Sequence, residues 1–257
     1  MNSFVRRTRI NACAVVFLFS MFLALSGGAV RAASPFAGWA AVVVSGDWHA
    51  HDGRPSAIFD NARRDVTHDL VGLGFSSRNI AGFSARPGAT HPASLRAVAT
   101  ALWRMSRRAS SGCLLYFTSH GSPNGILLGD SVLGPRTLGA TIDRVCGKRP
   151  TVVVLSSCFS GVFVPALARP NRIILTAARR DRTSFGCGQT DRYPYFDKCV
   201  LSVWPYANGF PALGRAAQLC VAARERREHV GPPSEPQLFV GADAARRIPH
   251  WRRRLSG

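Results

Sequence analysis

Short apolar runs alternate with amphipathic stretches along most of this 257-residue chain. The apolar runs have the length of β-strands and are rich in branched residues, whereas the amphipathic stretches repeat their apolar residues at helical spacing. Parallel strands need long crossover connections, so this alternation predicts an α/β fold with a mainly parallel central sheet covered on both faces. The predicted strands are 39–44, 79–83, 113–118, 151–155, 172–176 and 237–241, and the predicted helices are 57–73, 91–110, 135–145 and 210–227.

Two of the predicted strands end in turns that carry a reactive side chain. The strand at 113–118 leads to His120 and Gly121, and the strand at 151–155 leads to Cys158. Parallel strands end at the same edge of a sheet, so the two turns are expected side by side. An imidazole can take the proton of an attacking thiol, and a glycine lets a backbone N–H approach the substrate carbonyl group. A lone cysteine or histidine is more often a packing residue, but the joint pattern predicts a cysteine hydrolase.

The sequence around these two turns resembles the legumain-like cysteine peptidases of family C13, which belong with the caspases. The resemblance rests on YFTSHGS at 116–122 and SCFSG at 157–161, and SFGCG at 184–188 is similar to many bacterial members. The likeness extends from Trp39 to about Gly241. It implies a caspase-like three-layer α/β/α sandwich with a mainly parallel central sheet.

The resemblance also implies a mechanism. Cys158 would be the nucleophile that forms a thioester acyl-enzyme, His120 the base, and the N–H groups of Gly121 and Cys158 the oxyanion donors. The substrate would be a peptide or protein, and no cofactor is expected. Two alternatives remain open: a transpeptidase that uses the same dyad with an amine in place of water, and a non-catalytic caspase-fold binding protein that uses its basic surface.

Candidate substrate residues follow from the same comparison. Asp52 and Arg54 fall where eukaryotic legumains carry Asn and Arg, so Asp52 is expected to orient the histidine and Arg54 to line the primary pocket. The later pocket loop carries Asp181 and Arg182 where the family has an acidic residue, so asparagine specificity does not follow. Solvated loop charges are the alternative interpretation of Asp52 and Arg54. The predicted substrate-binding set is Arg54, Ser156, Asp181 and Arg182.

A zinc site is a rival interpretation of the first strand-end loop. His49, His51 and Asp52 lie close together in the sequence, and imidazole and carboxylate groups are zinc ligands. No further cluster of His, Asp or Glu in the sequence completes a site, and loop histidines are more often simply exposed. We therefore expect no metal.

The two ends of the chain differ from the predicted domain. A basic segment at 6–9 precedes an apolar run at 14–25 and a small-residue cleavage site, which is the order of a secretory signal peptide. Residues 1–32 are predicted to be this signal, so the mature protein would be periplasmic or secreted. An uncleaved membrane anchor is the alternative. Residues 33–245 are predicted to form the peptidase domain, and residues 246–257 a basic C-terminal tail.

The chain is strongly basic, with a formal net charge of +19. The positive residues are scattered over many segments instead of forming one stripe, so nucleic acid is not the expected partner. An anionic envelope or lipid surface is the partner that this charge favours. The sequence does not define an oligomeric state.

Seven cysteines limit the disulfides that the chain can form. Cys13 lies in the predicted signal peptide, which leaves six in a compartment where disulfides persist. If Cys158 stays free, the remaining five allow at most two bridges and one unpaired thiol. Cys187 with Cys199 is the first candidate pair.

Overall fold

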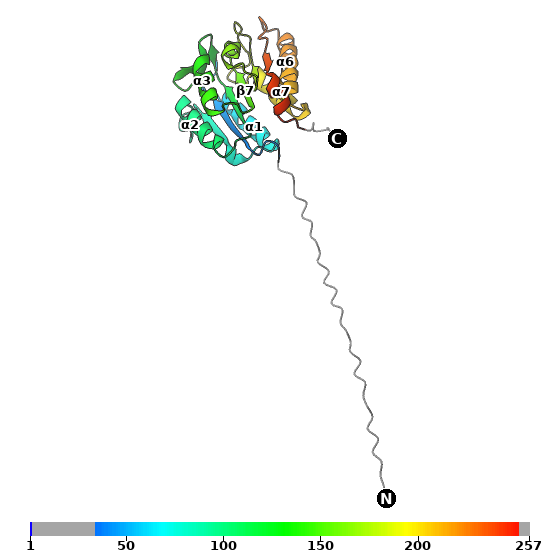
Figure 1. The fold of residues 1–257 in the computed structure, drawn as a ribbon. Helices are drawn as coiled ribbons and strands as arrows, with labels where there is room; N and C mark the ends of the chain where they lie inside the picture. The colour runs from blue at the N-terminus through cyan, green and yellow to red at the C-terminus, as the bar shows by residue number, and fades with distance from the viewer. Residues whose placement is uncertain (2–33, 252–257) are drawn as a thin grey trace. The chain divides into compact units, whose positions relative to one another are not determined.

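A computed structural model describes residue 1 and residues 34–251. Apart from residue 1, the predicted signal peptide lies outside these described residues. The main sheet has six strands, all parallel except the last, which is antiparallel to its neighbour (Figure 1). The predicted α/β fold is confirmed. In spatial order the strands are β2 (Ile80–Ser84), β1 (Trp39–Ser45), β3 (Gly112–Thr118), β7 (Thr151–Ser156), β8 (Arg172–Thr176) and β9 (Gln237–Val240).

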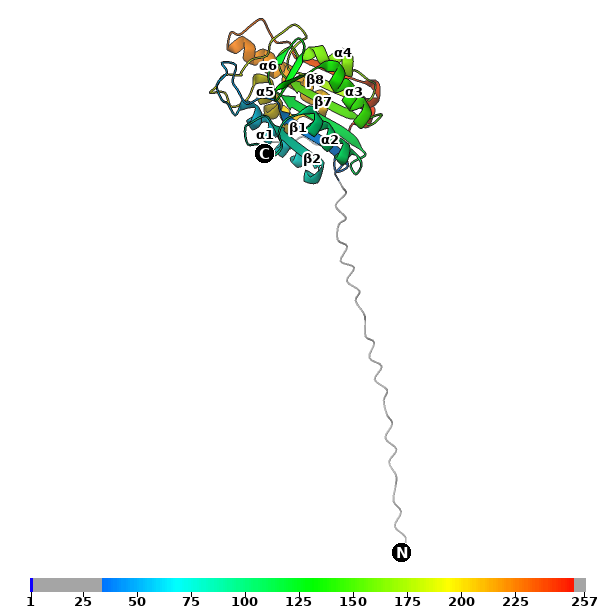
Figure 2. The ribbon, with the colours of Figure 1, turned by 90° about the vertical axis from the view of Figure 1, so that its left-hand side faces the viewer.

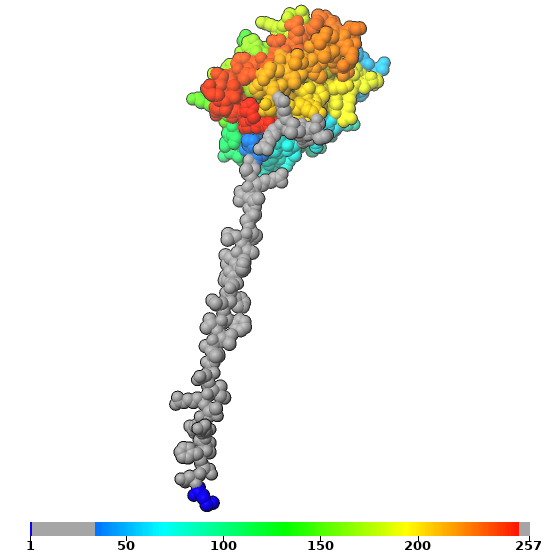
Figure 3. All heavy atoms as spheres, turned by 90° about the vertical axis from the view of Figure 1, so that its right-hand side faces the viewer, coloured from blue at the N-terminus to red at the C-terminus, as the bar shows by residue number. Residues whose placement is uncertain are grey.

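Helices cover both faces of this sheet, because the strand side chains alternate between two apolar cores. In β1, Ala41 and Val43 enter one core, and Ala40 and Val42 enter the other. Figures 1 and 2 show the two groups of helices on opposite sides of the strands, and Figure 3 shows α5, α6 and α7 together on one surface. The first core is covered by α1 (Ile58–Gly72), α5 (Tyr195–Val203), α6 (Phe210–Arg227) and α7 (Ala242–Arg247), and the second by α2 (Leu95–Ser106), α3 (Pro135–Val145) and α4 (Val164–Leu167).

A small antiparallel sheet that the sequence analysis did not predict follows β3. Its strands are β4 (Gly121–Ser122), β5 (Gly125–Leu128) and β6 (Ser131–Leu133). Ile126 and Leu133 are buried in the second core, which fixes this sheet against the domain. The predicted helix at 91–110 is shorter than expected, because the Ser94 side chain accepts the Ala97 N–H and caps α2 there. Short 3₁₀ segments lie at η1 (Ser77–Asn79), η2 (Ser160–Phe163) and η3 (Trp204–Tyr206).

Two disulfides are present, and their pairing corrects the sequence-based candidate. Cys113 on β3 is bonded to Cys146 at the end of α3, and Cys199 on α5 is bonded to Cys220 on α6. Cys199 cannot therefore pair with Cys187, because the packing of α5 on α6 already provides its partner. Cys158 and Cys187 are the free cysteines among the described residues.

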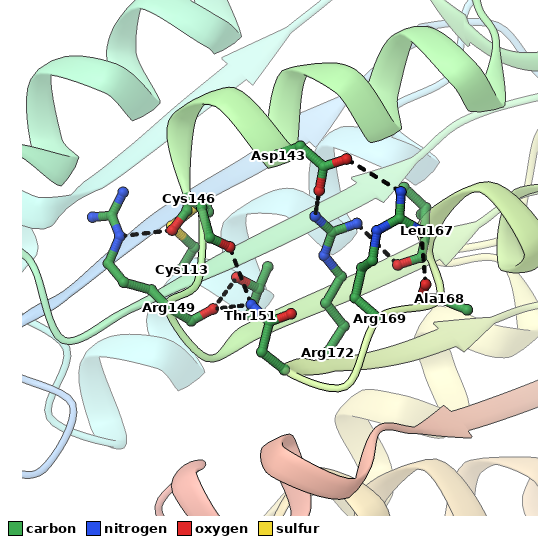
Figure 4. Close-up of polar contacts among 11 residues, drawn as sticks. Cys113, Asp143, Cys146, Arg149, Thr151, Leu167, Ala168, Arg169 and Arg172 are labelled. Carbon is green, nitrogen blue, oxygen red and sulfur yellow. Dashed lines mark hydrogen bonds and ion pairs between the residues drawn. A yellow bond between two sulfur atoms is a disulfide. The ribbon is translucent and has the colours of Figure 1, made fainter.

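The amino-terminal ends of the strands carry structural contacts (Figure 4). Arg172 at the start of β8 is fully buried and pairs with Asp143 of α3, and it also donates to the Leu167 carbonyl oxygen at 2.9 Å. Thr151 at the start of β7 is also fully buried, and its hydroxyl donates to the Arg149 carbonyl oxygen at 3.0 Å. These contacts lie at the opposite end of β7 from Cys158.

The C-terminal segment packs on the domain as far as it is described. α7 continues past residue 245, where the sequence analysis placed the end of the domain, and Ile248 is buried. The Trp251 ring lies 5.0 Å from that of Phe210 and 6.2 Å from that of Phe36. Within residues 34–251, no helix has the length and apolar character needed to cross a membrane.

Candidate active site

Two neighbouring strands set the positions of His120 and Cys158. β3 and β7 pair in parallel, with Thr118 opposite Ser156. The Ser119 N–H donates to the Ser156 carbonyl oxygen at 3.1 Å, so the pairing continues one residue past the end of β3. Each reactive residue lies two positions beyond the last strand pair. Both turns therefore leave the sheet at the same edge, as the sequence pattern predicted.

Gly121 lies where the two turns touch. A Cβ atom at this position would overlap the carbonyl oxygen of Cys158, so only glycine fits. The Leu127 N–H donates to the His120 carbonyl oxygen at 2.9 Å, which makes Gly121 and Ile126 a non-hydrogen-bonded pair of the small sheet. The Gly121 N–H is therefore not used by the ladder and is free to donate to a ligand.

The Cys158 thiol is partly buried and interacts with the loop that follows β8. The Ser184 N–H donates to Sγ at 3.2 Å, and Sγ lies 3.6 Å from the Ser184 carbonyl oxygen. Phe159, the next residue, has a left-handed backbone with φ of 57°, and its N–H donates to the Arg182 carbonyl oxygen at 2.8 Å. Burial raises the pKa of Cys158, and the Ser184 N–H opposes this only in part. The neutral thiol is thus the resting form at pH 7.

His120 is held from one side of its ring. Nε2 lies 3.2 Å from the His49 carbonyl oxygen and 4.0 Å from a carboxylate oxygen of Asp47. Both groups can only accept, so Nε2 carries the hydrogen and Nδ1 is left with its lone pair. The Phe59 ring meets the imidazole edge-to-face at 5.0 Å between centroids. The side chain is 27% exposed, so a substrate can reach it.

The carboxylate near His120 belongs to Asp47, not to Asp52 as the sequence comparison predicted. Asp47 comes two residues after β1 and is buried at the sheet edge, where it also binds His49 Nδ1 at 2.8 Å. Asp52 lies farther along the same loop and is exposed. Its carboxylate accepts the Arg54 N–H at 3.0 Å and lies 3.5 Å from Arg54 Nε.

The predicted pocket residues are not all gathered around the thiol. Arg54 is exposed, and its guanidinium donates at 3.3 Å to Oε1 of Gln189, which lies in the long loop between β8 and α5 (residues 177–194). Arg182 reaches the Cys158 turn only through its backbone, and its side chain pairs with Asp181 and with Glu235. Asp181 itself is exposed and lines a separate cavity beyond η2. Arg54 therefore keeps a place at the loop rim, whereas Asp181 and the Arg182 side chain belong to a neighbouring ion-pair cluster.

The histidines of the first loop are engaged in other contacts. His49 Nδ1 binds Asp47, and His51 Nδ1 lies 3.0 Å from the Cys187 carbonyl oxygen. Within residues 34–251, no group of three or more His, Cys, Asp or Glu side chains is arranged to hold a metal ion. A cavity of about 430 Å³ opens beside His120, lined by Asp47, His49, Ala50, His51, Gly53 and His120 itself.

Cys187 is a second free thiol near the site. Burial raises the pKa of Cys187 strongly, and the negative charge of a Cys158 thiolate would raise it further. A thiol of this kind stays protonated and reacts slowly. Cys187 also differs from Cys158 in its contacts. The Ser184 N–H donates to the sulfur of Cys158, and among the contacts described for residues 34–251 no backbone N–H donates to the sulfur of Cys187.

A buried carboxylate lies beneath the two turns. Asp197 on α5 is fully buried and accepts hydrogen bonds from Tyr116, from Thr118 at 2.6 Å and from Ser156 at 2.9 Å. Burial raises the pKa of Asp197 to about 6, and the three hydroxyl donors limit the rise. Ser156 was predicted to bind substrate. Its hydroxyl is instead turned inward and occupied by Asp197.

Asp47 and Asp197 are the polar residues that sequence reasoning missed. Asp47 stands directly beyond the first strand, which is the same kind of position as His120 and Cys158, so its place was a usable signal. Asp197 gave a weaker signal, because it is an acidic residue within a short apolar helix for which no element was predicted. The hydroxyl donors of Asp197 come from two neighbouring strands that are far from it in the sequence, and only the folded structure reveals them.

Comparisons with known proteins bear on the family and the fold of the chain. A model of the peptidase C13 family matches residues 104–205, which include both turns. No curated protein matches the chain in sequence. Among solved structures, the crystal structure of caspase-1 from Spodoptera frugiperda is similar with a TM-score of 0.58 and 14% identity, over 80% of this chain and 87% of that one. At this identity the likeness shows the fold alone. The match to the C13 family model over residues 104–205 and the caspase-like fold together support a legumain-like, cysteine-peptidase-like function.

Proposed function

We propose that the protein is an exported cysteine endopeptidase in which Cys158 is the nucleophile and His120 the base. The main support is the convergence of the two turns at one sheet edge, where Thr118 and Ser156 end paired strands. The free Nδ1 of the imidazole and the thiol held by a backbone N–H are the two groups that acyl transfer needs.

The reaction begins from a neutral thiol, because burial raises the pKa of Cys158. Nδ1 of His120 takes the thiol proton as Sγ forms a bond to the peptide carbonyl carbon. The C–N bond then breaks, and the imidazolium gives its proton to the leaving amine. Water attacks the resulting thioester, with Nδ1 accepting a water proton, and the thiol is restored when the acid product leaves.

Backbone donors stabilise the oxyanion in this scheme. The Gly121 N–H is not used by the small sheet, and the Cys158 N–H lies beside its own sulfur. Donors that are fixed before the reaction stabilise the developing charge without reorganisation. The His49 carbonyl oxygen and the Asp47 carboxylate face Nε2 and stabilise the imidazolium that forms in each step.

Export and the substrate pocket are further parts of the proposal. The order of residues in 1–32 supports a cleaved signal peptide, and the first residue of the mature protein, measured by mass spectrometry, is expected near Ala33. Arg54 at the rim of the long loop supports a preference for acidic or amide side chains. The charge of +19 supports contact with an anionic envelope or lipid surface.

A peptide library tests the central part of this proposal. The mature protein is expected to cleave a subset of peptides, and the Cys158→Ala variant to cleave none while its circular dichroism spectrum stays unchanged. Cys187→Ala is the matched control, because it removes the other free thiol and should retain cleavage. Cleavage by Cys158→Ala would refute the mechanism. A folded wild-type protein that cleaves nothing would favour the non-catalytic binding protein, and ligation of added amines would favour transpeptidation.

A further inference from the structure

Three strand hydroxyls converge on one carboxylate just below the reactive turns. Thr118, the last residue of β3, and Ser156, the last residue of β7, both donate to Oδ2 of Asp197. Tyr116 of β3 donates to Oδ1. All four residues are buried, with Asp197 fully inaccessible to solvent. A charged acceptor makes stronger and shorter hydrogen bonds than a neutral one, so this cluster holds the two strand ends firmly.

Asp197 lies on α5, the helix that follows the long loop. The N–H of Tyr195, the first residue of α5, donates at 3.0 Å to the carbonyl oxygen of Phe185, which is the residue after Ser184. Ser184 is the residue whose N–H donates to the Cys158 thiol. The helix therefore connects the turn that carries the base, the turn that carries the nucleophile and the loop segment that binds the nucleophile.

We propose that Asp197 is the positioning residue of the site: by holding Thr118 and Ser156 at one oxygen, it sets the separation of His120 and Cys158. Thr118 and Ser156 each lie two residues before a reactive side chain, so a shift of either strand end passes directly into the dyad. The inference rests on the proposed function. The inference goes beyond the proposed function because it gives a catalytic consequence to Asp197, whose side chain reaches neither substrate nor solvent.

Small substitutions test this role without deleting the carboxylate. Thr118→Val keeps the shape of the side chain and removes one donor, and Ser156→Ala removes the other. Thr151→Val is the matched control, because Thr151 is an equally buried strand threonine at the opposite end of β7. Asp197→Asn completes the set if it folds.

We expect Thr118→Val and Ser156→Ala each to lower kcat by about tenfold to a hundredfold with little change in KM, since a small misplacement of reacting groups costs rate more than binding. The double variant should lose less than the product of the two single effects, because both hydroxyls act through one oxygen. Thr151→Val should lower the melting temperature similarly and leave kcat unchanged.

The rate at which iodoacetamide modifies Cys158 gives a second readout that needs no peptide substrate. Thr118→Val and Ser156→Ala should reduce the part of this rate that depends on His120. That part is the difference between the rate of each variant and the rate of the same variant with His120→Ala added. If the two variants lower only the melting temperature, as Thr151→Val does, the positioning role is refuted. If His120→Ala itself leaves the wild-type rate unchanged, the proposed dyad fails first, so the two failures can be told apart.

Discussion

His120 has hydrogen-bond acceptors on one side of its ring and an open nitrogen on the other. The His49 carbonyl oxygen at 3.2 Å fixes the tautomer, while Asp47 at 4.0 Å supplies a negative charge that is largely shielded from water. A carboxylate at this distance attracts the positive charge that the ring would carry while it holds the thiol proton. We therefore propose that Asp47 assists the proton transfers of His120 without a direct hydrogen bond to it.

Replacing Asp47 tests this electrostatic assistance. Asp47→Asn keeps the size of the side chain and removes the charge, so kcat is expected to fall by about tenfold, which corresponds to about 1.4 kcal/mol of transition-state stabilisation. Asp52→Asn is the matched control, since this carboxylate is exposed and paired with Arg54. Steady-state kinetics on one cleaved peptide decides between them. Equal activity of both variants, or a larger loss in Asp52→Asn, would contradict the assignment.

At the scale of elements, the strands and long helices could be predicted because their signals are local. α3, α6 and β8 have the predicted bounds, since each is a single periodic segment between clear turn residues. The strands β4 to β6 are too short for periodicity and depend on burial against the second core. α5 directly follows Pro194, and its packing on α6 is fixed by a disulfide whose pairing has no sequence signal.

The candidate site, like the fold, could be predicted from the sequence only in part. The turns of His120 and Cys158 were predictable because strand register and strand order bring parallel strand ends together. The choice between Asp47 and Asp52 could not be predicted, because both lie in one loop and only the turn after β1 decides which carboxylate faces inward. The inward rotation of Ser156 was hidden for a similar reason: its acceptor comes from a helix 41 residues later.

At the scale of the whole molecule, Asp197 couples folding to pH. Its pKa is raised from 3.8 to about 6 in the folded protein, mainly by burial, so the folded state holds this proton more tightly than the unfolded state. The stabilising contribution of the protonated form is fully present below about pH 4 and is lost as the pH rises through 6. Ionised Asp197 therefore costs stability at neutral pH, on the order of 3 kcal/mol.

Urea unfolding of the wild type and of Asp197→Asn at pH values from 4 to 7 measures this cost. The free energy of unfolding of the wild type, relative to that of the variant, should decrease as the pH rises across this range. The remaining titrating groups act on both proteins and cancel in the difference. A difference that stays constant, or grows with pH, would show that the carboxylate does not titrate as the buried environment requires.

The dyad itself is tested most directly by the pH dependence of Cys158 alkylation. Iodoacetamide modification of Cys158, followed by peptide mass spectrometry, is compared between the mature wild-type protein and His120→Ala. We predict that the wild type reacts at least about tenfold faster at pH 7.5, because His120 takes the thiol proton. Burial raises the pKa of Cys158, so in His120→Ala, where no base takes the proton, the rate should keep rising beyond pH 9. Identical pH profiles for the two proteins would contradict the account, because Cys158 would then react without its base.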